Sequence, residues 1–140
     1  MTLWRPVAWY VRGMIVGTGT DLVEIARVRE ALERFGPRFE QKVFTENEIA
    51  YCRSKNKGAA ESFAARFAAK EAAAKALGTG ISRGISWREI EVIRKRGARP
   101  ELIFHGRAAE RARSLGAQKA HLSLTHGRES AIAVVILESA

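Results

Sequence analysis

The clearest helical pattern in the chain runs from Lys57 to Leu77. This segment is dense in alanine, the residue with the highest helix propensity, and Gly78 follows it as a C-terminal cap. We therefore expect the longest helix of the protein here. At 100° per residue, Phe63 and Phe67 lie on one stripe of this helix, so that face is predicted to pack against the core.

Shorter elements are expected on both sides of this helix. Runs of apolar and β-branched residues between turn signals predict strands at 14–20, 85–94, 101–104, 121–125 and 131–137. Apolar spacings of three and four residues predict helices at 22–35, 38–42, 45–53 and 108–115. Thr45 and Glu48 form a capping-box pattern. Because helices and strands follow without strict βαβ order, we predict a single α+β domain, residues 14–140, with helices packed on a mostly antiparallel sheet.

Composition adds a strong positive charge to this picture. The 140 residues include 24 Lys and Arg against 15 Asp and Glu, a formal net charge of +9. A basic surface attracts nucleic acid, anionic lipid, phosphorylated cofactors or an acidic protein, and it is also an ordinary solvated surface. The sequence has no apolar run of about 18 residues, so no transmembrane helix is expected. The single cysteine, Cys52, excludes an internal disulfide and fits the cytoplasm.

Asp21 is the first candidate for chemistry. It stands where the strand containing Ile15 and Val16 is expected to stop, shortly after Gly17 and Gly19. A carboxylate in this place commonly belongs to a metal or phosphate site. Aspartate is also a favoured N-cap residue, so capping the next helix is the competing interpretation.

Glu71 and Lys75 are the second candidates. Glu71 lies about 40° from Phe67 around the long helix, and Lys75 lies about 40° further on, so Glu71 borders the apolar face. A carboxylate is costly to bury there unless a cation meets it. That cation is either Lys75, in an ordinary i, i+4 pair, or a metal, which would leave Lys75 to face a phosphate.

A polar strand face near the C-terminus is the third candidate. In a strand, His121, Ser123 and Thr125 share one face, which suits a phosphate or a sugar and equally suits solvent. Combined with Asp21 and Glu71, these groups fit a magnesium–phosphate site, because Mg²⁺ is held by one or two carboxylates, waters and substrate phosphate oxygens. The sequence contains no ligand cluster suited to zinc and no GxxxxGK[ST] loop.

Four motifs stand in the order found in one family. The chain resembles the holo-acyl-carrier-protein synthase family, the small 4′-phosphopantetheinyl transferases, from about Met14 to Glu138, and the motifs are GTGTDLVE at 17–24, RFAAKEAAAK at 66–75, GTGI at 78–81 and HLSLTH at 121–126. The resemblance implies the 4′-phosphopantetheinyl transferase fold. It also implies a Mg²⁺-dependent enzyme that transfers 4′-phosphopantetheine from coenzyme A to a serine of apo acyl carrier protein. The reaction releases 3′,5′-ADP and supports fatty acid biosynthesis.

The resemblance implies roles for individual residues. Asp21 and Glu71 are expected to be magnesium ligands and, together with His121, catalytic residues. Lys75 and His121 are expected to contact coenzyme A phosphates, with Arg66 helping at the cofactor. Two acceptors for the serine proton remain open: a water oriented by Glu71, and His121, whose ordinary pKa lies near neutrality.

The resemblance also implies partners. Arg27 matches a position that meets the acidic carrier protein. Members of this family are typically homotrimers with an active site at each subunit interface, so a neighbouring chain is expected to complete the site. Residues 1–13 precede the usual start of the family, at Met14. They are either a real extension of unknown role or the product of an upstream start codon chosen in error.

The main alternative is a basic nucleic-acid-binding module without catalytic activity. It would use the charge run Arg94-Lys95-Arg96. The sequence lacks an aromatic RNA-binding signature and a helix-turn-helix, and this alternative leaves Asp21 and Glu71 unexplained. We therefore expect neither nucleic acid nor a membrane as a partner. The intact set of site residues also argues against an inactive homologue.

Overall fold

The computed structural model describes residues 13–140, so the predicted extension at 1–13 lies outside the described residues except for Gly13. The elements are β1 (Ile15–Glu24), α2 (Ile25–Phe35), α3 (Pro37–Val43), α4 (Glu46–Arg53), α5 (Ala59–Ala76), β2 (Ile90–Ile93), β3 (Glu101–Phe104), α6 (Gly106–Ser114), β4 (Lys119–His126) and β5 (Ser130–Glu138). Two 3-10 turns, η1 (Asn56–Gly58) and η2 (Trp87–Glu89), precede α5 and β2.

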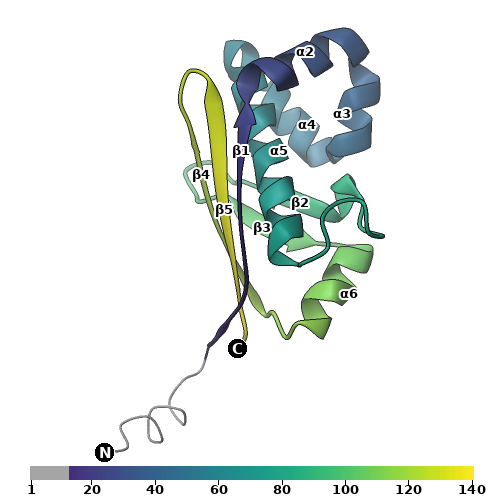
Figure 1. The fold of residues 1–140 in the computed structure, drawn as a ribbon. Coiled ribbons are helices and arrows are strands. Elements are labelled where there is room, and N and C mark those ends of the chain that lie inside the picture. Colours follow the sequence, from purple (N-terminus) through teal and green to yellow (C-terminus); the bar gives the residue numbers. More distant parts are fainter. Residues whose placement is uncertain (1–12) are drawn as a thin grey trace, which may run out of the picture.

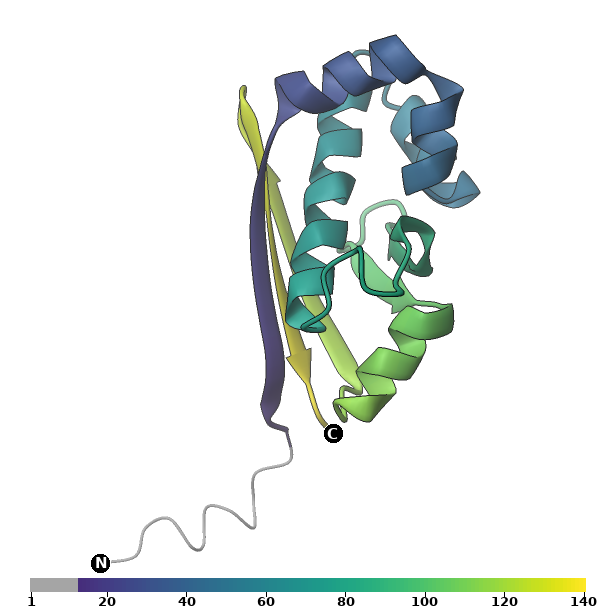
Figure 2. The ribbon, with the colours of Figure 1, turned by 45° about the vertical axis from the view of Figure 1, so that its right-hand side comes forward.

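The strands form two antiparallel sheets. The larger has the order β1-β5-β4, and β2 pairs with β3 in the smaller one. The helices lie on one side of the three-stranded sheet, and α5 runs along that face (Figures 1 and 2). This arrangement confirms the predicted α+β class with antiparallel pairing.

Two glycines allow β1 to pass close to α5. A Cβ atom on Gly17 would overlap the carbonyl oxygen of Ala76, and one on Gly19 would overlap that of Ala72. Side chains alternate along a strand, so Asp21 points to the same side as Gly19. The close approach therefore places the Asp21 carboxylate against α5.

The strand β1 is longer than predicted. Its ladder with β5 continues to Glu24, with Asp21 opposite Ala133, and α2 begins only at Ile25. Asp21 consequently lies inside the strand, and the interpretation of Asp21 as a helix N-cap is wrong. Leu22, which the periodicity assigned to a helix, is a strand residue with 59% of its surface exposed.

Other predicted elements are present with shifted ends. The long helix begins at Ala59, after η1, and the strand predicted at 85–94 is confined to Ile90–Ile93. Trp87 instead belongs to η2, and its ring packs on Phe67 at a centroid distance of 4.7 Å. Within residues 13–140, no helix is long and apolar enough to span a membrane.

The face of the three-stranded sheet that points away from α5 has no helix over it among residues 13–140 (Figure 2). We call it the outer face. Leu22, Ile132 and Val134 are 59%, 37% and 40% exposed there. Ser123 lies opposite Val134 and Thr125 opposite Ile132, so the polar side chains of β4 share this face with the apolar band. The predicted grouping of His121, Ser123 and Thr125 is confirmed, because these residues are exposed while Leu122 and Leu124 between them are partly buried.

Candidate active site

A cavity of about 540 Å³ opens between β1, α2 and α5. Its polar lining contains four of the predicted site residues: Asp21, Arg27, Glu71 and Lys75. Its apolar lining includes Val28, Ala31, Phe39 and Phe67. We call this the acidic-residue cavity, because Asp21 and Glu71 both face it.

Lys75 bonds to β1 in this cavity. Its Nζ donates to Asp21 Oδ1 at 3.0 Å and to the carbonyl oxygen of Thr20 at 3.1 Å. The i, i+4 pair with Glu71, one of the two alternatives left open by the sequence, is not formed, because the close approach of β1 brings the acceptors of Thr20 and Asp21 to Lys75. The Lys75 side chain is half exposed, so this ion pair contributes at most about 1 kcal/mol to stability. Lys75 can therefore turn toward a ligand at little cost.

Glu71 is half-buried beside Asp21. Burial raises the pKa of Glu71, the charge of Asp21 raises it further, and Lys75 opposes both effects. Two carboxylates that repel each other in one cavity are suited to binding a divalent cation. Nowhere in residues 13–140 do three or more His, Cys, Asp or Glu side chains gather as ligands. Two oxygen donors without nitrogen or sulfur fit Mg²⁺, which completes its shell with water and phosphate oxygens, and do not fit zinc.

A second cavity, of about 790 Å³, opens at the other edge of the sheet. We call it the basic cavity, because its lining includes Arg66, Lys55 and the charged run Arg94–Arg96, together with Tyr51 and the end of β4 at Leu124–His126. It lies at the edge formed by β4, whereas the acidic-residue cavity lies at the edge formed by β1.

Arg66 is suited to binding an anionic ligand in the basic cavity. Only 3% of the residue is exposed, and its guanidinium lies 4.2 Å from the Tyr51 ring centroid. Nη1 donates to the carbonyl oxygen of Ser62 at 3.3 Å, but Nε and Nη2 are buried with no partner among the described residues. Buried N–H groups are nearly always satisfied, so this cation is suited to a phosphate or a carboxylate.

The sequence did not point to several residues of the basic cavity. Tyr51 and Lys55 lie near the end of α4, and no sequence spacing connects them to Arg66 on α5. The run Arg94-Lys95-Arg96 was a visible signal, but it suggested a nucleic-acid surface. The structure places it at the cavity that contains Arg66.

His121 faces neither cavity. It lies on the outer face of β4, where its Nε2 is 2.8 Å from Glu138 Oε1, whereas Asp21 points to α5 on the other side of the sheet. The strand β5 also separates β4 from β1. A single chain therefore does not bring His121 together with Asp21 and Glu71.

The sequence matches the family model described as the 4′-phosphopantetheinyl transferase superfamily over residues 17–135. The chain belongs to this superfamily. Two relatives of this transferase are the holo-[acyl-carrier-protein] synthases of Koribacter versatilis and Maridesulfovibrio salexigens, 53% and 47% identical over 125 residues. In both comparisons the match covers 89% of this chain and 99% of the relative.

Solved structures agree with this membership. A Bacillus anthracis holo-(acyl-carrier-protein) synthase in complex with CoA (3′,5′-ADP) is 38% identical, with a TM-score of 0.75 over 91% of this chain and 99% of the other. The Helicobacter pylori synthase in complex with coenzyme A is 31% identical, with a TM-score of 0.75 over 86% and 98%. The predicted family, fold and enzyme class are confirmed, and they disfavour a nucleic-acid-binding module without catalytic activity.

Proposed function

We propose that this transferase moves 4′-phosphopantetheine from coenzyme A to a serine hydroxyl of an apo acyl carrier protein, and that Mg²⁺ is its metal. The observation that carries the proposal is the acidic-residue cavity, where Asp21, Glu71 and Lys75 provide two carboxylates and one movable cation. Coenzyme A offers a pyrophosphate to such a set. The relatives named synthases and the structures with bound coenzyme A support this substrate.

In the reaction, the serine oxygen attacks the phosphorus that carries the pantetheine arm, and the bond from that phosphorus to the 3′,5′-ADP leaving group breaks. Asp21 and Glu71 would hold Mg²⁺. The chemistry that the ion would supply when bound is neutralisation of the negative charge on the pyrophosphate and on the leaving oxygen. Lys75 turns from Asp21 to a phosphate oxygen and adds a positive charge beside it.

The serine proton needs an acceptor in the same cavity. We favour a water oriented by the Glu71 carboxylate, because Glu71 lines the same cavity as Asp21 and Lys75, where the serine and the phosphate would meet. His121 is the alternative candidate for the acceptor of this proton. It reaches the cavity only from another copy of the chain.

We further propose a homotrimer in which each site is shared between two copies. The outer face carries the exposed apolar band Leu22, Ile132 and Val134, which calls for a covering surface. Asp21 and Glu71 face the β1 edge, whereas the basic cavity lies at the β4 edge and His121 lies on β4. When one edge of a chain meets the opposite edge of the next, the contact is head-to-tail, and we propose that the rotation between copies closes it into a ring of three.

Intact-protein mass spectrometry tests the reaction. We expect an apo acyl carrier protein of fatty acid biosynthesis, incubated with this protein, coenzyme A and Mg²⁺, to gain the mass of one phosphopantetheine. EDTA should abolish the gain, and a carrier with alanine at the acceptor serine is the matched control. No gain with any of several carriers, or a gain that survives EDTA, would contradict the proposed substrate or the proposed metal, respectively.

Arg27 is the proposed contact for the acidic carrier. It is exposed at the acidic-residue cavity and makes no ion pair within residues 13–140, whereas Arg29 pairs with Glu61 at 3.4 Å. We expect Arg27→Glu to raise the KM for the carrier about tenfold and to leave the KM for coenzyme A unchanged, because opposite charge mainly speeds encounter. Steady-state kinetics at low and high salt measure this, and the wild-type KM for the carrier should also rise with salt.

The matched control is Arg113→Glu, which makes the same charge change on α6, at the far end of the molecule from α2 (Figure 1). An equal rise in the carrier KM from both variants would show an effect of net charge. It would contradict a specific role for Arg27.

A further inference from the structure

A fully buried ion pair lies inside the helical layer, apart from both cavity linings. Lys70 on α5 and Glu48 on α4 have no exposed side-chain surface, and Lys70 Nζ lies 2.7 Å from Glu48 Oε1. Burial lowers the pKa of Lys70, and the charge of Glu48 opposes that shift. Two charges are costly to desolvate, and a buried pair is a weak source of stability. The proposed reaction assigns it no role.

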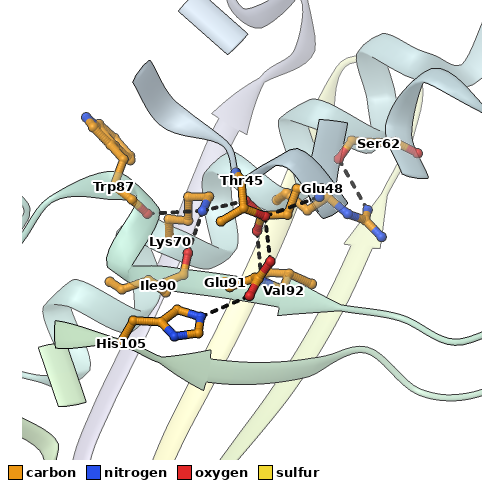
Figure 3. Close-up of polar contacts among 10 residues, drawn as sticks. Thr45, Glu48, Ser62, Lys70, Trp87, Ile90, Glu91, Val92 and His105 are labelled. Atoms are coloured by element: carbon orange, nitrogen blue, oxygen red, sulfur yellow. Dashed lines mark hydrogen bonds and ion pairs between the residues drawn. The ribbon is translucent and has the colours of Figure 1, made fainter. Parts of the chain in front are cut away.

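Each group of this pair is fully bonded. The Lys70 ammonium has three N–H donors, and its acceptors are Glu48 Oε1, the carbonyl oxygen of Trp87 at 3.1 Å and the carbonyl oxygen of Ile90. Glu48 in turn accepts from the backbone N–H groups of Thr45 at 2.9 Å and Val92 at 2.7 Å. Figure 3 shows these bonds converging from α4, α5, η2 and β2. The pair therefore ties three other elements, α4, η2 and β2, to one point on α5.

That point lies next to functional residues on both helices. Tyr51 follows Glu48 by three residues on α4, and Arg66 precedes Lys70 by four on α5, so each is one helical turn from the pair. The guanidinium of Arg66 and the Tyr51 ring are in contact at 4.2 Å in the basic cavity. Glu71 is the next residue after Lys70 and lines the acidic-residue cavity.

The segment 87–90 adds a second connection. Lys70 bonds to the carbonyl oxygen of Trp87, and the Trp87 ring packs on Phe67 with centroids 4.7 Å apart. Phe67 lines the acidic-residue cavity beside Glu71. The bonds of Lys70 thus restrain the side of α5 that carries the cavity wall.

We propose that Lys70 and Glu48 are positioning residues, which set the register of α5 against α4 and against the segment 87–92 and so hold Arg66 and Glu71 in their two cavities. The inference rests on the proposed function, since it assigns these two cavities to the substrate and the metal. Neither Lys70 nor Glu48 touches a reacting atom. Their effect is on the placement of residues that do.

A double variant tests this role. Lys70→Met alone leaves the Glu48 carboxylate buried without a cation and is expected to lower Tm strongly. Glu48→Gln with Lys70→Met removes both charges, keeps similar volumes and is expected to regain much of that Tm. We expect the double variant to lower kcat at least about tenfold, because a misplacement of about 1 Å can cost a hundredfold in rate. In the free protein, we expect about fivefold weaker binding of 3′,5′-ADP by calorimetry and of Mn²⁺ by electron paramagnetic resonance.

The matched control is Val43→Ala, a buried residue at the end of α3 that lines neither cavity. Assays run at a temperature where circular dichroism shows both proteins folded. The control should keep kcat and both affinities within about twofold of wild type. If the double variant does the same, the pair is only structural and the positioning role is wrong.

The two proposals fail in different ways. Wild-type protein that modifies no carrier would contradict the proposed function. Binding of 3′,5′-ADP and Mn²⁺ needs no carrier, so these affinities still decide the positioning role. Affinities in the double variant equal to those in Val43→Ala would overturn it.

Discussion

Replacing Glu71 by glutamine is expected to lower kcat by at least about a thousandfold, because the variant loses one of two metal-holding carboxylates. Without added metal, the same variant should be at least as stable as wild type at neutral pH. The raised pKa of Glu71 means that the folded protein holds a proton there more tightly than the unfolded chain does. Stability is therefore lost as pH rises through the folded pKa, and the neutral glutamine avoids that loss.

Steady-state kinetics with saturating coenzyme A and carrier, and a thermal melt at pH 7 without added metal, measure both effects. Glu110→Gln on the exposed face of α6 is the control, and it should keep the rate within about twofold. Asp21→Asn should lose as much activity as Glu71→Gln, since both carboxylates line one cavity. A wild-type rate from either variant would refute the assignment of these residues to the metal.

Mixing two impaired variants, Asp21→Asn and His121→Ala, is expected to restore activity. In the proposed ring, Asp21 comes from one copy and His121 from its neighbour, so Asp21→Asn and His121→Ala each damage every site of their own homotrimer. In a 1:1 random mixture, a shared site is fully wild type when a His121→Ala copy provides Asp21 and the neighbouring Asp21→Asn copy provides His121. That arrangement occurs at about a quarter of the interfaces, so about a quarter of the wild-type rate should return.

The control mixture combines Asp21→Asn with Glu71→Gln. These two residues line the same cavity of the same chain, so no mixed ring contains a wild-type site and no activity should return. One variant of each mixture carries a short affinity tag, because Asp21→Asn and Glu71→Gln change the mass of the chain equally. The variants are unfolded and refolded together, and native mass spectrometry verifies mixed rings. Mixed rings of Asp21→Asn and His121→Ala without activity would contradict the shared site. Activity from the control mixture would place Asp21 and Glu71 on different chains.

Local patterns in the sequence determined the parts of the site that lie within one helix or one strand. The alanine-rich periodicity predicted α5 and placed Glu71 at the border of its apolar face, where burial now raises the pKa of Glu71. The capping box of Thr45 and Glu48 is present, and the two-residue period of β4 placed His121 on the exposed face. Each of these features depends on neighbours within about one helical turn or two strand positions, which a sequence pattern records directly.

Only the tertiary structure decided how these parts meet. β1 continues past Asp21 because β5, more than 100 residues further along the chain, supplies its hydrogen-bonding partner. Lys75 bonds to Asp21 and not to Glu71, because two glycines bring β1 against α5. The burial of Arg66, the pair of Lys70 with Glu48 and the separation of His121 from Asp21 likewise depend on segments remote in sequence. Hydrogen-bond partners and burial are set by whichever groups packing brings together, and no local period encodes that choice.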